Sequence, residues 1–386
     1  ILSIAVFFAA IFAIPEPVPE NTSIKNSGTE LPPPLQTPLQ TPGVWEDREN
    51  DLEEIPVEIP GKPKESEAVE IETKPDEKEI TIDLDAGLID LIVPVTPVQI
   101  NTLSVSEINT RAREALVNII CTNQQGGLLQ PITGSGIVID DRGVILTNAH
   151  IAQYYLLRDY IAPNYLECNI RTGSPAINAY KAELLYISPS WVRENSNQIR
   201  LSEPKGTGED DFALLLITEP FRKDAELPDK FSFVPPLIKE LEPEIGDDTV
   251  AAGYPAGFLG GQSIQKNLYA VSTTAKVMDV FTFASDSLDL FSVGGSIAAQ
   301  KGSSGGGIIN LEGELLGIVV TASTAEQTDD RDLRAITLSH ISRSLKKDTG
   351  LRLEEFLRGD LSAKSLNFRQ SIAPGLTTLL ENALNN

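Results

Sequence analysis

Short apolar runs separated by turn residues fill positions 105–345, and this pattern constrains the fold more than any other feature. Many runs are four to eight residues long and rich in β-branched side chains. About a dozen such runs with few helical periods are typical of an all-β sandwich or barrel pair. A parallel α/β fold needs a helix between successive strands, and we find no such helices. The runs are GSGIVID, GVILTN, NYLECNIR, YKAELLYI, DFALLLI, DTVAAGYP, LYAVSTTAKVM, GIIN, ELLGIVVTA and RAITLSHI.

Helical spacing is confined to the two ends of this region. The run SEINTRAREALVNIICT predicts a short helix that leads into a strand over 115–121. Residues 341–386 carry apolar side chains at helical spacing. We therefore expect a folded domain over 105–345 and a C-terminal helical tail over 346–386.

Residues 15–104 have a different composition. The stretch 15–100 contains 14 of the 26 prolines and has a net charge of −14. Such a segment cannot bury enough apolar surface to offset its chain entropy, so we expect a disordered, extended stalk. Two alternatives stay open: the prolines of 31–43 form a recognition segment, or the apolar island 80–95 docks as a strand.

Residues 1–14 are apolar except for Ser3. The run is too short to span a bilayer alone, so it fits the remnant of a membrane helix or of a signal peptide. A buried core helix is a third reading, although Pro15 and the polar stalk follow at once. We favour an anchor, because no small-residue cleavage site is evident. The anchor predicts an extracytoplasmic, membrane-anchored protein, and the signal peptide a secreted one.

Charge and composition exclude several function classes. The net charge of −24 argues against nucleic-acid binding, although more than half of it belongs to the stalk. Two cysteines and two histidines leave little material for a zinc site or a disulfide-dense scaffold. We expect no metal and no cofactor.

The first candidate motif is Leu-Thr-Asn-Ala-His, which ends at His150 after the paired runs GSGIVID and GVILTN. A histidine at a strand end can accept and return a proton near neutral pH. A structural histidine in a turn is the alternative. His340 lies in a passage from strand to helix, and there we favour a histidine that stabilises the fold over a catalytic base.

The second motif places acids directly before the apolar strand FALLLI. Such an acid can accept the second ring N–H of a histidine and stabilise the imidazolium. Asp210 and Asp211 both qualify, and the register of the apolar run favours Asp211. An acid before a strand is common, so this motif alone is weak.

The third motif is the glycine-rich stretch 302–307, GSSGGG. Ser304 can serve as a nucleophile if a base reaches its hydroxyl. The amides of Gly302 and Ser304 could then form an oxyanion hole. A flexible turn is the alternative reading of the same composition.

Together the motifs are specific, because the order His150, Asp211, Ser304 is that of chymotrypsin-type proteases. The sequence resembles trypsin-like peptidases of the bacterial HtrA group over residues 106–347. The residues that carry the resemblance are GSGIVIDDRGVILTNAH, DFALLLI, VAAGYPAGFLGGQS, GSSGG and RAITLSHISRSL. The resemblance implies two six-stranded antiparallel barrels, about 105–235 and 236–345, with the triad in the cleft between them.

The chain departs from the family pattern at several positions. Ser303 stands where chymotrypsin relatives carry an aspartate that pairs with a freed N-terminus, so activation by trimming is not expected. Gly307 replaces a proline of the pattern. About 40 residues follow the resemblance in this sequence, and we expect no PDZ domain among them.

The resemblance also places a specificity pocket. Its base falls in 296–301, at Ala298, and its wall in 319–322, with Val320 and Thr321. Because Ala298 is small and uncharged, we expect cleavage after small or medium aliphatic residues and not after Arg or Lys.

Cys121 and Cys168 fall on two predicted strands of the first barrel. An oxidising compartment would permit a disulfide between them, and two buried free thiols are the alternative.

The sequence therefore predicts an extracytoplasmic serine endopeptidase that acts on polypeptides through an acyl-enzyme. One alternative is a non-catalytic peptide-binding module on a protease-like fold, and another is a structural surface protein in which the acidic stalk matters most.

Overall fold

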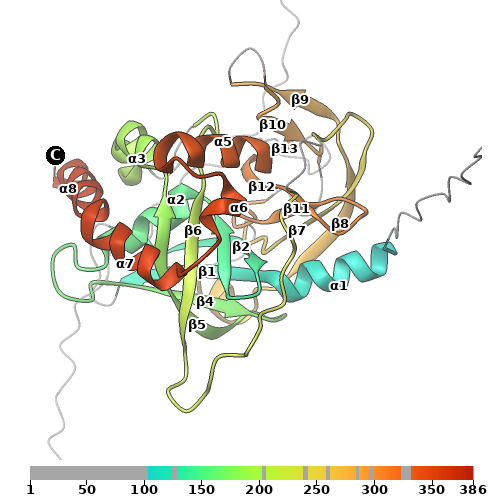
Figure 1. The fold of residues 1–386 in the computed structure, drawn as a ribbon. Helices are drawn as coiled ribbons and strands as arrows, with labels where there is room; N and C mark the ends of the chain where they lie inside the picture. The colour runs from blue at the N-terminus through green and yellow to red at the C-terminus, as the bar shows by residue number, and fades with distance from the viewer. Residues whose placement is uncertain are drawn as a thin grey trace, which may run out of the picture. The chain divides into compact units, whose positions relative to one another are not determined.

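Strand pairing divides the folded region into two antiparallel sheets, as the computed structural model of the chain shows (Figure 1). All described residues lie in one unit, Ile92–Asn386. Within them, no helix is long and apolar enough to cross a membrane. The predicted anchor 1–14 and nearly all of the predicted stalk 15–104 lie outside the described residues. The structure describes residues 103–123, 129–201, 206–237, 242–257, 261–283, 287–295, 300–322 and 332–385.

The first barrel begins with the predicted passage from helix to strand. Helix α1 (Val105–Ala115) starts at Ser104, whose hydroxyl accepts a hydrogen bond from the Glu107 amide. The Glu107 carboxylate accepts one from the Ser104 amide, which completes a capping box. Strand β1 (Leu116–Asn123) follows without a loop, and its first six residues are buried.

The first sheet closes into a six-stranded barrel in the order β1-β2-β3-β6-β5-β4. Every residue of β3 and the first five of β6 are buried, as expected for fully apolar strands inside a barrel. Short helices that the sequence analysis did not predict fill the connections. The elements are β2 (Ile132–Asp140), β3 (Val144–Thr147), α2 (Ala149–Ala152), η1 (Gln153–Leu157), β4 (Leu166–Thr172), β5 (Ile177–Ile187), α3 (Pro189–Asn195), η2 (Ser196–Arg200) and β6 (Ala213–Pro220).

The second sheet has seven strands in the order β8-β7-β11-β12-β13-β10-β9. The all-β, two-sheet prediction is confirmed, whereas six strands were expected here. The hairpin of β9 and β10 was not predicted, because strands of three residues are too short to show an apolar run. The elements are β7 (Asp248–Gly253), α4 (Gly261–Lys266), β8 (Val271–Lys276), β9 (Asp279–Phe281), β10 (Leu290–Ser292), β11 (Gly307–Ile309), β12 (Leu315–Ala322) and β13 (Leu333–Thr337).

The C-terminal helices return to the first barrel and cover its outer face (Figure 1). The Ser365 hydroxyl donates to the Leu184 carbonyl of β5 at 2.9 Å. The ring of Tyr186 lies within 6.0 Å of the Phe356 and Phe368 rings. The predicted tail 346–386 is thus part of the barrel's packing. It contains the end of α5 (Leu338–Thr349), a helix that directly follows β13 of the second sheet, and then α6 (Leu353–Phe356), α7 (Leu361–Ser371) and α8 (Ala373–Asn385).

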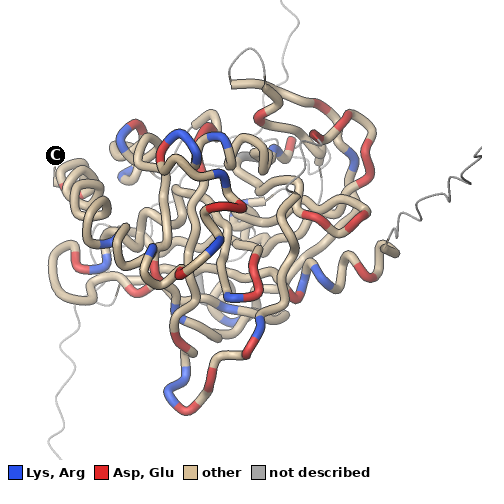
Figure 2. Tube along the Cα trace, in the orientation of Figure 1, with Lys and Arg blue, Asp and Glu red and all other residues tan. Residues whose placement is uncertain are grey.

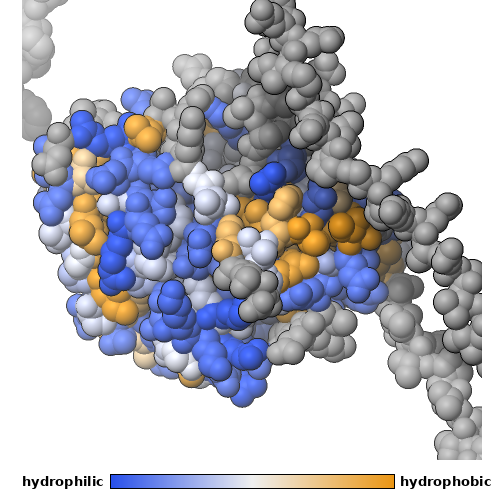
Figure 3. Space-filling model, turned by 90° about the horizontal axis from the view of Figure 1, so that it is seen from above, coloured by the Kyte–Doolittle hydropathy of each residue, from blue (hydrophilic) through white to orange (hydrophobic). Residues whose placement is uncertain are grey.

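Charged side chains of both signs are interspersed over the described chain (Figure 2). In the view from above, hydrophilic residues cover much of the described surface and apolar residues gather in separate areas (Figure 3).

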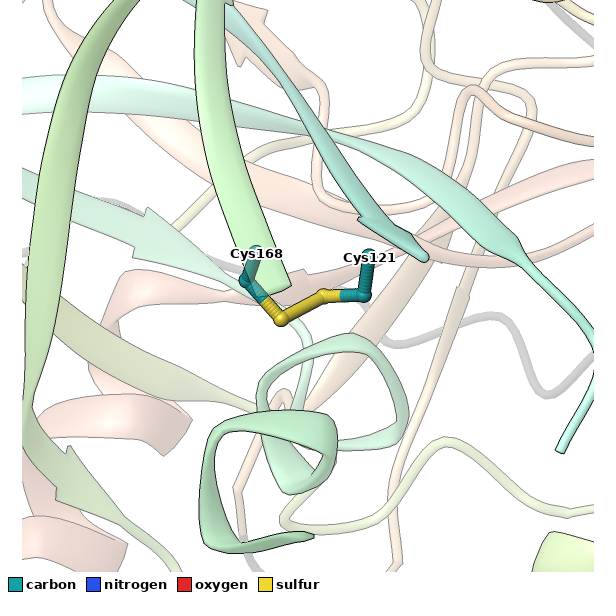
Figure 4. Close-up of a disulfide and its surroundings, with 2 residues drawn as sticks. All are labelled: Cys121 and Cys168. Carbon is teal, nitrogen blue, oxygen red and sulfur yellow. A yellow bond between two sulfur atoms is a disulfide. The ribbon is translucent and has the colours of Figure 1, made fainter. Parts of the chain in front are cut away.

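Cys121 of β1 and Cys168 of β4 form a disulfide (Figure 4). The two residues stand opposite each other in the antiparallel pairing of these strands. Of the two alternatives that the sequence leaves open, the structure has the bridge, and the described residues include no free cysteine.

Candidate active site

His150 lies just beyond the end of strand β3, in the short helix α2. Asn148 precedes this helix, and its side-chain amide donates to the Asp211 carbonyl at 2.9 Å. The Gln153 amide donates to the His150 carbonyl at 3.0 Å. Side chains on both sides thus fix the main chain that carries His150.

Asp211 binds His150 through both of its carboxylate oxygens. Oδ1 accepts a hydrogen bond from the His150 amide at 2.9 Å, and Oδ2 lies 2.7 Å from Nδ1. The Asp211 side chain is 7% exposed and that of His150 is 25% exposed. A carboxylate at Nδ1 keeps the proton there, which leaves Nε2 as the basic nitrogen.

Asp210, the other candidate acid, contacts the second histidine. Its Oδ1 lies 3.0 Å from Nε2 of His340, while Nδ1 of the same ring lies 2.9 Å from Oδ1 of Asp289. Asp211, which the register of the apolar run favours, is thus the acid that contacts His150, and the neighbouring carboxylate of Asp210 contacts the other histidine.

Ser135 of β2 attaches the Ser304 loop to the first barrel. Its amide donates to the Ser304 carbonyl at 2.7 Å, and its hydroxyl donates to the Gly302 carbonyl at 2.7 Å. The hydroxyl also accepts a hydrogen bond from the Tyr254 amide at 2.8 Å. Ser135 is not among the predicted site residues, although its place between Gly134 and Gly136 in GSGIVID is a usable signal.

Glycine is required at two positions of this loop. Gly305 has a φ of 83°, and a Cβ there would lie 2.1 Å from the Ser135 carbonyl oxygen. Gly302 has a φ of 97°, and its Cβ would lie 2.6 Å from the Tyr254 carbonyl oxygen. Only glycine tolerates this conformation and this approach, so GSSGGG is more than a flexible turn.

The amides of the loop differ in their hydrogen bonding. Within the described residues, the amides of Gly302 and Ser304 donate no hydrogen bond, whereas the Ser303 amide donates to Gln300 at 3.1 Å. The Ser303 hydroxyl is buried and, among these residues, has no partner. It occupies the position where the family pattern has an aspartate.

Among the described residues, no hydrogen bond links Nε2 of His150 to the Ser304 hydroxyl. The fold brings the two residues to the same edge of the first barrel, because β2 binds the main chain of Ser304 and also pairs with β3, which leads to His150. Hydrogen bonds of this kind are often long before substrate binds.

The predicted specificity pocket is described only in part. Ala298 lies outside the described residues, as does the side chain of Thr321. Val320 is buried at a bulge in the pairing of β12 with β13, and its side chain lies next to Gly208. In the described ranges, no group of three His, Cys, Asp or Glu side chains could hold a metal ion.

A known protein family matches part of the chain. Residues 134–318 match the family model of the trypsin-like peptidase domain, which confirms the predicted family. A serine endoprotease from Yersinia pestis shares 20% identity at a TM-score of 0.41, over 64% of this chain and 68% of the other. The Rv3671c protease from M. tuberculosis, in its active form, shares 18% sequence identity at a TM-score of 0.38. The match covers 65% of this chain and 86% of the other. No curated protein matches the chain.

Proposed function

Since the chain carries a trypsin-like peptidase domain, we propose that it is a serine endopeptidase with His150, Asp211 and Ser304 as its catalytic residues. The observation that carries the proposal is the pair of hydrogen bonds from His150 to Asp211. The bond at Nδ1 favours the ring tautomer that a general base for a serine requires, and the amide bond fixes the main chain that carries the ring.

The reaction begins when the Ser304 hydroxyl oxygen attacks the carbonyl carbon of a peptide bond. Nε2 of His150 takes the hydroxyl proton, and Asp211 stabilises the imidazolium that forms. The carbonyl π electrons move onto oxygen, and the amides of Gly302 and Ser304 bind that oxyanion. The C–N bond then breaks, and His150 returns the proton to the leaving amine.

Water completes the cycle. His150 removes a proton from the water molecule as its oxygen attacks the acyl carbon, and the ester bond to Ser304 breaks. Ser304 recovers its proton from His150. The products are a carboxylic acid and the free enzyme, and every step uses groups of this chain and water alone.

We also propose that the peptidase works outside the cytoplasm and is attached to the membrane by residues 1–14, with a secreted form as the alternative. The apolar sequence of that segment supports the proposal. The Cys121–Cys168 disulfide supports it as well, because disulfides persist in oxidising compartments. Protease added to intact cells should digest the chain, and complete protection until lysis would contradict the proposal.

The test of the peptidase proposal is hydrolysis of an unfolded protein substrate by the full chain and by Ser304→Ala. The wild type should cleave it and Ser304→Ala should not. Ser303→Ala is the matched control, because it removes the neighbouring hydroxyl from the same loop and should leave cleavage in place. Binding without cleavage by the wild type would favour the peptide-binding module.

A further inference from the structure

His340 joins the two sheets through a pair of carboxylates. It lies on α5, with Nδ1 2.9 Å from Asp289 and Nε2 3.0 Å from Asp210. Asp210 belongs to the turn before β6 of the first barrel, and Asp289 directly precedes β10 of the second sheet. The His340 side chain is 11% exposed and that of Asp289 is 2% exposed.

The imidazolium form matches this environment. A neutral imidazole has a single N–H donor, whereas both ring nitrogens of His340 face carboxylate oxygens. Burial opposes the charge, but the hydrogen bonds to Asp210 and Asp289 outweigh it, so the pKa of His340 is raised. Arg343 adds a second cation on the Asp289 side, at 2.6 Å.

The turn that His340 holds is strained and borders the candidate triad. Asp210 has a φ of 55°, a left-handed conformation that costs a non-glycine residue energy and persists only when neighbours fix it. The next residue is Asp211, whose carboxylate binds His150. Adjacent carboxylates therefore point to different histidines, and the turn that positions one of them positions the other.

We infer that His340 is a positioning residue for the peptidase: by binding Asp210 and Asp289 together, it fixes the turn that presents Asp211 to His150. The inference rests on the proposed function, since it assigns a role within the same site. His340 touches no reacting atom. Its effect reaches His150 only through the main chain that Asp210 and Asp211 share.

The test compares His340→Gln with Lys346→Gln in the full chain. Both substitutions remove a cation from α5, but Lys346 is exposed. We expect His340→Gln to reduce kcat about 10-fold to 100-fold and to change KM less, because misplacement of a catalytic group slows chemistry more than binding. The control should retain wild-type kcat. A kcat within twofold of wild type in His340→Gln would overturn the inference.

A second readout does not depend on peptidase activity. The chain contains only two histidines, so histidine labelled with ¹⁵N gives two assignable rings in an NMR spectrum. In His340→Gln, His150 is the remaining labelled histidine, and its ring nitrogen signals should shift from their wild-type positions. In Lys346→Gln, the His150 signals should keep their wild-type positions. If the wild type lacks peptidase activity but this shift occurs, the proposed function fails and the coupling stands. Unchanged His150 signals would overturn the inference even in an active enzyme.

Asp289→Asn keeps the test decisive if His340→Gln does not fold. It removes one charge on the far side of His340 and leaves Asp210 and Asp211 intact. Its effects on kcat and on the His150 signals should have the same direction as those of His340→Gln and be smaller. A variant that lowers the melting temperature but leaves both readouts at wild type would show that the cluster is merely structural.

Discussion

Asp211 fixes His150 at two points, the main-chain amide at 2.9 Å and the ring nitrogen Nδ1 at 2.7 Å. The amide contact sets the position of the helix that carries the ring, and the ring contact sets its tautomer. One buried carboxylate therefore determines where the basic nitrogen Nε2 points.

Asp211→Asn should reduce kcat about ten-thousand-fold and leave the fold intact. The amide has nearly the same shape, but it no longer favours the tautomer with a basic Nε2 and cannot stabilise an imidazolium. Steady-state kinetics with a peptide substrate measure the effect. Asp141→Asn is the matched control, because Asp141 forms a surface ion pair with Lys230, which contributes little. Equal activity of the two variants would exclude Asp211 from the site.

Gly305→Ala should abolish activity and destabilise the domain by more than about 3 kcal/mol. The new Cβ would combine a left-handed backbone with a clash against the Ser135 carbonyl. Gly350→Ala separates the two causes, because Gly350 has a φ of 79° and nothing within 4 Å of its Cβ position. It should cost only about 1 kcal/mol. Urea unfolding measures the loss of unfolding free energy in each variant. Similar losses in Gly305→Ala and Gly350→Ala would contradict the close approach of the loop to β2.

The buried His340 cluster should make stability depend on pH in a defined window. The raised pKa of His340 means that its contribution is fully present below the ordinary histidine pKa of 6.5 and is lost as the pH rises through the higher folded pKa. Although burial opposes ionisation of Asp210 and Asp289, their hydrogen bonds lower both pKa values. Their contribution is present above the ordinary value of 3.8 and is lost as the pH falls through the lower folded values.

Stability from this cluster should therefore be greatest between about pH 4 and 6.5, with Arg343 as the other charged group that contacts it. Melting temperatures across the pH range test this expectation. His340→Gln should flatten the decline on the alkaline side. An equally steep decline in that variant would assign the pH dependence to other groups.

Removal of the disulfide should lower stability without altering the active site. The bridge closes a loop of 47 residues, which corresponds to about 4 kcal/mol in the chain-entropy model. Substitution of both Cys121 and Cys168 by alanine should shift urea unfolding by that amount and leave kcat unchanged. Titration of the unreduced protein should find no free thiol at these positions, and two reactive thiols would refute the bridge.

Cleavage should follow small or medium aliphatic residues. The expectation rests on Ala298 at the predicted pocket base, where no charge is available to pair with Arg or Lys. Profiling with a peptide library gives the preference directly. A strong preference for basic residues at the cleavage position would refute this assignment of the pocket.

The sequence predicted those parts of the site that lie beside regular strands. His150 follows an apolar strand and Asp211 precedes another. The lengths and registers of these two apolar runs are therefore enough to place both residues at strand ends. The apolar runs likewise predicted an all-β fold, whereas the closed six-stranded barrel was implied by the resemblance to the family.

The remaining features depend on contacts that no local pattern records. Asp210 and His340 are 130 residues apart, and Ser135 and Gly302 are 167 apart, so only the folded chain brings them together. Strands β9 and β10 have three residues each, too few to show an alternation of apolar and polar side chains. The sequence indicates a structural role for His340, and one of its two carboxylate partners is Asp210, the acid that does not contact His150.

The most direct test of the central claim is the site of reaction with a fluorophosphonate, which modifies only an activated serine. Peptide mapping of the labelled full chain should find one adduct on Ser304, and Ser304→Ala or Asp211→Asn should prevent its formation or slow it greatly. Ser303→Ala should still react. Absence of any adduct on Ser304 in the wild type would contradict the proposed catalytic mechanism.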